Sequence, residues 1–176
     1  MRFEIFICFI AFLFSCSGNN NGITGKAIEE FISKYENVKF DELRGVSISI
    51  RGRKSIGEVV YIVGKFEGDL PVYIVTYDLQ KGKIADINRK NLEKSKVQDY
   101  LSREEIMDAI KVIRKYNFFY LATDSLQNVY INPFYADEPP YLLRLKTFTG
   151  DSILRKGFVY ELYKDKWYLN RTRRSD

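Results

Sequence analysis

The loop Asn132–Pro140 contains the residues whose types and spacing come closest to a chemical signature. It reads Asn-Pro-Phe-Tyr-Ala-Asp-Glu-Pro-Pro and holds three of the chain's four prolines. Asp137 and Glu138 form a pair of carboxylates, the groups that glycoside hydrolases use as acid and as nucleophile or base. Two adjacent acids on one loop are a weak signal for that chemistry, because the sequence marks no second acidic cluster to face them. Asp124 and Asp151 are interpreted as turn residues.

The same loop is better suited to holding a partner than to turning over a substrate. Proline restricts its own backbone and that of the residue before it, so a proline-rich loop loses little entropy on binding. Phe134 or Tyr135 is the candidate apolar anchor of a protein contact. Asp137 and Glu138 would steer the loop toward a basic patch on the partner. The alternative is a rigid crossover between strands, with Phe134 packed into the core.

The composition excludes the most familiar catalytic centres. The chain has no histidine, which is the most common general base and metal ligand. Its two cysteines are Cys8 and Cys16, both near the N-terminus, so the rest of the chain has no thiol nucleophile and no Cys/His zinc set. A Ser-His-Asp triad is likewise excluded. We therefore expect a protein that is not an enzyme and that carries no cofactor or metal.

The N-terminus has the pattern of an export signal. The apolar run Ile5–Phe14 follows Arg2 and gives way to the polar stretch Ser17–Gly22. A helix needs about 20 apolar residues to cross a bilayer, and this run is shorter. Its length is typical of the core of a signal peptide, about 7–15 residues. An ordinary secretory cleavage near Cys16 is the alternative to the more specific interpretation that follows.

The segment Leu13-Phe14-Ser15-Cys16 resembles the lipobox of bacterial lipoproteins. The resemblance implies that a peptidase removes residues 1–15 and that Cys16 carries diacylglycerol and further acyl chains such as palmitate. Two or more chains hold a protein stably on a membrane. Because Ser17, and not aspartate, follows the cysteine, the resemblance also favours the outer membrane. No acidic run follows, which favours the face toward the periplasm.

Hydrophobic periodicity predicts an α+β domain of two main helices on mostly antiparallel sheet. Apolar residues at helical spacing predict a helix over 26–35, with Thr24 as its N-cap. Ser102-Arg103-Glu104-Glu105 is a capping box that begins a second helix, which stops at Asn117. Alternating and β-prone runs predict strands at 46–50, 58–66, 72–79, 84–87, 118–123, 129–131, 141–148, 158–163 and 167–171. Turns are predicted at Glu67–Asp69, Lys81-Gly82, Gly150-Asp151 and Asp165-Lys166.

The chain is expected to divide into a leader (1–15), a lipidated cysteine with a flexible tether (16–25) and one globular domain (26–176). The hydrophobic content of 45% is sufficient for a real core in a domain of this length. The order helix, strands, helix, strands would also suit a duplicated unit of one helix and one β-meander. The alternation of Leu143 and Leu145 with Arg144 and Lys146 predicts that one face of that strand is wet.

The net charge of +5 suits an anionic partner. Basic residues group at Arg51-Gly52-Arg53-Lys54, Arg89-Lys90 and Arg171-Thr172-Arg173-Arg174. Behind a lipid anchor we do not expect nucleic acid. The expected function is a non-catalytic protein-binding module that neutralises a toxin or inhibits an envelope enzyme. The alternative is a structural or accessory envelope lipoprotein that contacts peptidoglycan or anionic lipid. The partner and the oligomeric state stay open.

The lipobox generates the first prediction. Replacing Cys16 by Ala should release the protein from membranes into the soluble fraction and block removal of the leader, because the acyl chains are attached to that thiol. Fractionation and gel migration measure both effects. A substituted protein that fractionates and migrates as the unaltered one does would contradict the lipoprotein interpretation.

Overall fold

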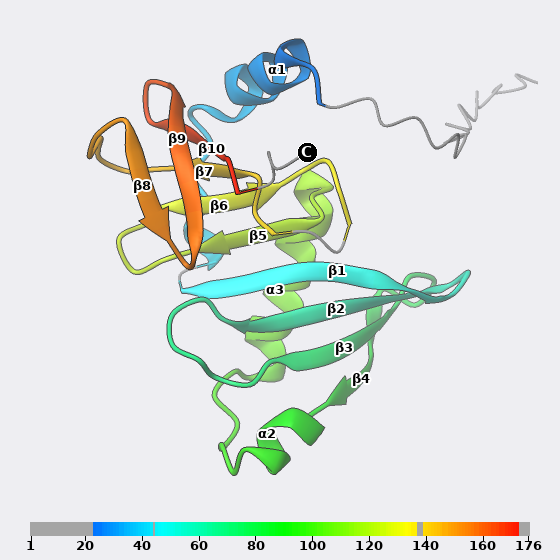
Figure 1. Cartoon of the computed structure of the whole chain (residues 1–176). Helices are drawn as coiled ribbons and strands as arrows, with labels where there is room; N and C mark the ends of the chain where they lie inside the picture. The colour runs from blue at the N-terminus through cyan, green and yellow to red at the C-terminus, as the bar shows by residue number, and fades with distance from the viewer. Residues whose placement is uncertain (1–22, 44, 137–138, 173–176) are drawn as a thin grey trace, which may run out of the picture.

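The computed structural model describes residues 23–43, 45–136 and 139–172, and these form one antiparallel sheet with helices on one side (Figure 1). The sheet order is β4-β3-β2-β1-β5-β6-β7-β10-β9-β8. The strands of the first half are β1 (Val46–Ser55), β2 (Glu58–Lys65), β3 (Tyr73–Asp78) and β4 (Lys83–Asn88). Those of the second half are β5 (Tyr120–Thr123), β6 (Val129–Asn132), β7 (Leu142–Arg144), β8 (Ser152–Arg155), β9 (Phe158–Lys164) and β10 (Trp167–Asn170). The helices are α1 (Gly25–Tyr35), η1 (Asp41–Leu43, a 3₁₀ turn), α2 (Lys90–Lys94) and α3 (Arg103–Tyr116).

α3 begins and ends where the sequence predicts, and α1 ends at the predicted Tyr35 but begins one residue earlier, at Gly25. The Thr24 hydroxyl accepts a hydrogen bond from the backbone N–H of Ala27 at 3.3 Å at the start of α1. Ser102 and Glu105 form both bonds of the capping box at the start of α3. The backbone N–H and the hydroxyl of Ser102 both stabilise the carboxylate, which lowers the pKa of Glu105. Asn117 ends α3 in the left-handed conformation, which asparagine tolerates better than most residues.

The two main helices cross over in their packing. α1 precedes β1 to β4 in the chain but covers the second half of the sheet, and α3 precedes β5 to β10 but covers the first half. On the first half, the Arg103 guanidinium of α3 donates to the carbonyl of Ile84 in β4 at 2.7 Å. On the second half, the Phe31 ring of α1 lies 6.0 Å from the Trp167 ring of β10, edge to face. Glu29 of α1 also pairs with Lys164 of β9 at 3.2 Å. The α+β class is therefore confirmed, and the helices bind the two halves of the sheet together. The duplication of a helix-plus-meander unit stays a prediction.

The sheet is buried on its second face as well, in the half formed by β5 to β10. There β8 and β9 turn out of the plane and lie in front of β7 and β10 (Figure 1). The Tyr130 ring lies 4.3 Å from Phe66 and 6.4 Å from Tyr160, measured between ring centroids. The residues buried in this cluster are Phe66, Ala122, Tyr130, Leu143, Leu145, Tyr160 and Tyr168.

Two predictions about the second half are wrong. The strand predicted over 141–148 is only Leu142–Arg144, and Gly150-Asp151 is not the turn of a hairpin. A further strand, β8, follows it and pairs with β9 through a turn at Lys156-Gly157, whose φ angles are 51° and 79°. Two positive φ angles suit the right-handed twist of a hairpin. The sequence did not predict this turn, because lysine stands at a position where asparagine or aspartate is the usual signal.

The predicted wet face of the strand at 141–148 is wrong at Arg144 and confirmed at Lys146. Leu143 and Leu145 pack in the second cluster, while Arg144 points to the opposite side, against α1. Arg144 is half-buried there and Lys146 is exposed. Period-two alternation shows which residues share a face, but it does not show that a helix distant in sequence covers the polar face.

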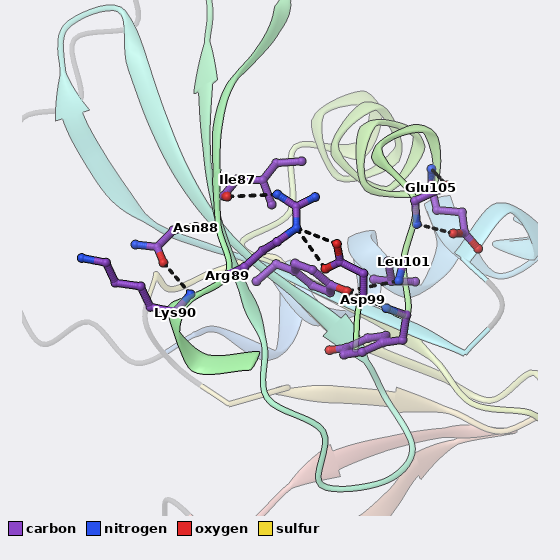
Figure 2. A network of polar contacts seen from close by, with 10 residues as sticks. Ile87, Asn88, Arg89, Lys90, Asp99, Leu101 and Glu105 are labelled. Atoms are coloured by element: carbon purple, nitrogen blue, oxygen red, sulfur yellow. Dashed lines mark hydrogen bonds and ion pairs between the residues drawn. The ribbon is translucent and has the colours of Figure 1, made fainter. Parts of the chain in front are cut away.

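The connection from β4 to α3 is held by an ion pair within itself (Figure 2) and by a side chain of β3. Arg89 Nε lies 2.9 Å from both carboxylate oxygens of Asp99. The Tyr73 hydroxyl accepts hydrogen bonds from the backbone N–H groups of Tyr100 and Leu101 at 2.8 and 3.2 Å. The connection is thereby fixed just before the cap of α3, and the charge of Arg89 is neutralised.

The capping box generates a stability prediction. Ser102→Ala should lower the free energy of unfolding by about 1 kcal/mol, since the N–H of Glu105 loses its acceptor at 3.2 Å. Urea unfolding, followed by circular dichroism, measures the change. Ser33→Ala is the matched control, because Ser33 is exposed within α1 and caps nothing. Equal effects of the two substitutions would contradict the role of the cap.

Candidate functional site

The loop between β6 and β7 is clamped at its base by Asn132. This side chain is fully buried, at 0% exposure. Its amide oxygen accepts hydrogen bonds from the backbone N–H groups of Phe134 and Tyr135, both at 3.1 Å. Its amide nitrogen donates to the carbonyl of Pro139 at 3.0 Å. One side chain therefore binds both the departing and the returning strand of the loop.

A second clamp holds the carbonyl of Pro140. It accepts a hydrogen bond from Asn170 Nδ2 at 3.0 Å and one from the Tyr160 hydroxyl at 3.3 Å. Burial, with a smaller contribution from Tyr120, raises the pKa of Tyr160, so its hydroxyl stays protonated and able to donate. The end of the loop is thus bound to β9 and β10 as well as to β6.

Phe134 points inward from this loop. Its ring centroid lies 6.1 Å from that of Phe31 in α1 and 5.7 Å from that of Tyr141, the latter edge to face. Aromatic rings at such separations contribute to packing. Of the two aromatic residues proposed as an anchor, Phe134 therefore supports the loop from within.

Tyr135 lies at the exposed end of the loop, with 36% of its surface accessible, and Ala136 beside it is exposed as well. The acidic candidates Asp137 and Glu138 lie outside the described residues, as does the lipidation candidate Cys16. The two aromatic candidates therefore lie on one clamped loop but face different ways. Phe134 packs against the domain, and Tyr135 is accessible to solvent.

A cleft of about 540 Å³ opens at the opposite end of β6. The chain between α1 and η1, the β5–β6 turn and the ends of β7 and β10 form its walls. Its charged lining residues are Glu36, Lys39, Asp41, Asp124, Arg144, Lys146 and Lys166. The lining is therefore mixed in charge, with more cations than anions.

Arg144 is a half-buried cation of the cleft, and its hydrogen bonds are made to the protein itself. Its guanidinium donates to the carbonyls of Tyr35, Glu36 and Val38 at 2.8, 3.2 and 2.7 Å. These carbonyls lie at and just beyond the end of α1, where no helical partner remains for them. Burial lowers the pKa of Arg144. The side chain is a structural cap more than a ligand-binding group.

Asp124 also serves the fold. Its carboxylate accepts hydrogen bonds from the backbone N–H groups of Leu126 and Asn128 at 3.0 and 2.8 Å. The Asn128 amide and the Tyr130 hydroxyl donate to its other oxygen at 2.8 and 3.3 Å. Asp124 thus closes the β5–β6 turn, as the sequence predicts for a turn residue.

The most buried acid of the cleft is Asp124, and its carboxylate is occupied by four hydrogen bonds from Leu126, Asn128 and Tyr130. Among residues 23–43, 45–136 and 139–172, no group of three or more acidic side chains is placed to hold a metal ion. The clamped loop is the better candidate site.

Sequence reasoning missed the two side chains that shape this region, Asn132 and Arg144. Asn132 stands before Pro133, and asparagine commonly accepts hydrogen bonds from backbone groups two residues on, so this signal could have been found. The role of Arg144 could not, because its partners near Tyr35 are distant in sequence.

The chain matches no protein-family model, no curated protein and no solved structure. In the part of the chain that the structure describes, no helix has the length and apolar character to span a bilayer.

The clamp generates a third prediction. Asn132→Ala should lower the free energy of unfolding by about 2–3 kcal/mol, because three hydrogen bonds to a buried side chain are lost. It should also accelerate amide hydrogen exchange at Phe134 and Tyr135. Asn37→Ala, at an exposed position, is the control for both measurements. Unchanged exchange at Phe134 and Tyr135 would show that the loop does not depend on Asn132.

Proposed function

We propose that this protein is a lipid-anchored, non-catalytic binding module of the bacterial envelope, and that the tip of the 132–140 loop contacts a protein partner. The observation that supports the proposal is the clamped loop. Asn132, which is 0% exposed, holds the base of the loop by hydrogen bonds, while Tyr135 is accessible at the tip. A loop that is already ordered loses little entropy when it binds.

Tyr135 is the proposed anchor. Tyrosine offers a large apolar ring with few rotatable bonds and a polar end, and it is enriched among the residues that dominate binding energy. Asp137 and Glu138 follow it in sequence and would face the rim of the contact. Charges at a rim act mainly on the association rate and on its salt dependence. The partner proposed here therefore carries a basic patch around an apolar pocket.

The location is part of the same proposal. Acyl chains on Cys16 would hold the module at the outer membrane, facing the periplasm. A module that neutralises a toxin or inhibits an envelope enzyme needs affinity and a fixed position, and it needs no turnover. The clamped loop meets the first need and the anchor would meet the second.

The first step of the test is to capture the partner in cells. A photo-crosslinking amino acid replaces Tyr135 in one variant and Leu126 in a control variant. Leu126 is 63% exposed in the β5–β6 turn, at the other end of β6. A protein that crosslinks from position 135 and not from position 126 is the expected partner. Equal capture from both positions would count against the loop.

The second step measures affinity with the purified partner. Tyr135→Ala should weaken binding by about 30-fold or more, since the loss of an aromatic anchor costs about 2 kcal/mol or more. Leu126→Ala should leave the affinity unchanged. Asp137→Asn with Glu138→Gln should slow association and reduce its dependence on salt. Firm retention on peptidoglycan or anionic lipid, without any protein partner, would favour a structural envelope lipoprotein instead.

A further inference from the structure

The β1–β2 hairpin ends in a projecting ribbon. β5 pairs with β1 only at Ser47–Ser49, and one more bond joins the N–H of Ile50 to the carbonyl of Phe119 at 2.9 Å. From Arg51 onward β1 is bonded to β2 alone, and this end of the hairpin extends to one side of the sheet (Figure 1).

Basic residues are placed along this ribbon by two irregularities in its register. Ile50 and Gly52 pair with consecutive residues of β2, so Arg51 is an extra residue, and Lys54 is extra in the same way between Arg53 and Ser55. Such bulges bend a strand and increase its twist. Arg51, Arg53 and Lys54 are all exposed, so the irregularities spread three cations around the ribbon.

At the apex lies Ile56, with 93% of its surface accessible. Glycine, asparagine, aspartate, serine and proline are the residues that favour turns, each for a backbone reason. Isoleucine has no such advantage, and at this exposure its apolar side chain gains almost nothing from the folded domain. The fold therefore does not explain an aliphatic side chain at the apex, two residues after Lys54.

Within the described residues, Arg51, Arg53 and Lys54 take part in no ion pair, and neither does Lys83 of β4. Lys83 lies in register with this end of the hairpin, across β3: it pairs with Asp78, and Asp78 pairs with Glu58. We call these four residues with Ile56 the basic tip.

Two acids lie near the tip, and within the described residues neither forms an ion pair with these four cations. Asp78 accepts hydrogen bonds from the N–H groups of Gln80 and Lys81, both at 2.9 Å, and pairs with the Lys81 ammonium at 3.2 Å. Glu58 lies 3.5 Å from the Ser55 hydroxyl. Elsewhere the protein pairs comparable cations, Arg89 with Asp99 and Arg171 with Glu161, each at 2.8–2.9 Å. The basic tip differs from those sites because its four cations are unpaired among the described residues, and they outnumber the single carboxylate of the hairpin, Glu58.

We propose that the basic tip docks on an anionic phospholipid surface, with its four cations at the lipid phosphates and Ile56 inserted among the headgroups. Each basic residue near such a surface strengthens association by about fivefold. A bilayer also provides an apolar interior for Ile56, whereas a hydrated anionic polymer would leave that side chain in water. The combination of cations and an apical aliphatic residue thus selects lipid over polymer.

The tip is a separate surface from the 132–140 loop. Ser49 of β1 pairs with Tyr120 of β5, and Tyr120 pairs with Asn132 of β6. The tip therefore follows β1 and the loop follows β6 at the same end of the sheet. Docking of the tip needs no protein partner, and its test uses only this chain and lipid vesicles. Failure of one proposal therefore leaves the other standing.

The test uses tryptophan fluorescence at the apex of the hairpin. Trp167 is the chain's single tryptophan and is 0% exposed, so it supplies a constant background. The full chain with Ile56→Trp is mixed with vesicles of brominated phosphatidylglycerol or of brominated phosphatidylcholine. Bromine quenches tryptophan that enters the bilayer. We expect quenching by the anionic vesicles, less quenching by the neutral ones, and reversal by high salt.

The control for membrane contact through other parts of the chain is Leu154→Trp. Leu154 is 68% exposed on the edge strand β8, in the other half of the sheet. Its tryptophan should not be quenched. Equal quenching at positions 56 and 154, or none at position 56 on anionic vesicles, would overturn the proposal. Sedimentation with polyphosphate in the absence of quenching would overturn it in favour of a polymer.

Charge variants in the Ile56→Trp background test the role of the cations. Arg53→Gln and Lys54→Gln should each raise the vesicle concentration for half-maximal quenching by about fivefold. Lys94→Gln, at the exposed end of α2, is the matched control and should leave that concentration unchanged. Equal shifts for Lys94→Gln and the two tip variants would reduce the effect to net charge and would contradict a specific tip. Circular dichroism confirms that each variant is folded.

Discussion

The packing of α1 on the second half of the sheet is the constraint on which the rest of the structure depends, and Arg144 holds its end. The guanidinium of Arg144 binds three carbonyls at and beyond the end of α1 and lies over the rings of Phe40 and Trp167, at 5.2 and 5.5 Å. α3 covers the first half of the sheet instead. Each half is therefore covered by a helix that does not directly precede it in the chain. The two halves therefore share one cluster of buried residues.

This arrangement gives the two ends of the sheet different properties. At one end, the chain that leaves α1, the Asp124 turn and Arg144 enclose a cleft whose most buried charges are bound to the protein itself. At the other end, the clamped loop follows β6 and the basic tip follows β1, with β5 between these two strands, and each carries an exposed side chain, Tyr135 or Ile56. The surfaces proposed for protein and for lipid therefore lie at the same end of the sheet. A module docked through its tip would hold its recognition loop close to the membrane.

Much of the fold follows from local rules and could be predicted. Thr24 and Ser102 mark the two main helices because their hydroxyls satisfy N–H groups that have no helical partner. Period-two alternation located the first half of β1, which the structure extends to Ser55, and β-prone runs located β2 and β3. Asp165 marked the β9–β10 turn. Prediction failed at β8, where a short exposed strand has no clear alternation, and where a lysine adopts the positive φ more often left to asparagine or glycine.

By itself the sequence determined which catalytic groups are missing, the α+β class, and the residues that cap the main helices. Each of these depends on side-chain identity or on neighbours a few positions apart. Only the tertiary structure decided which candidates face outward. It placed Phe134 against α1 and left Tyr135 accessible. It paired Arg89 and Arg171 with acids and left Arg51, Arg53 and Lys54 unpaired among the described residues. The physical reason is the same in both cases: burial and charge compensation depend on contacts between residues that are far apart in sequence.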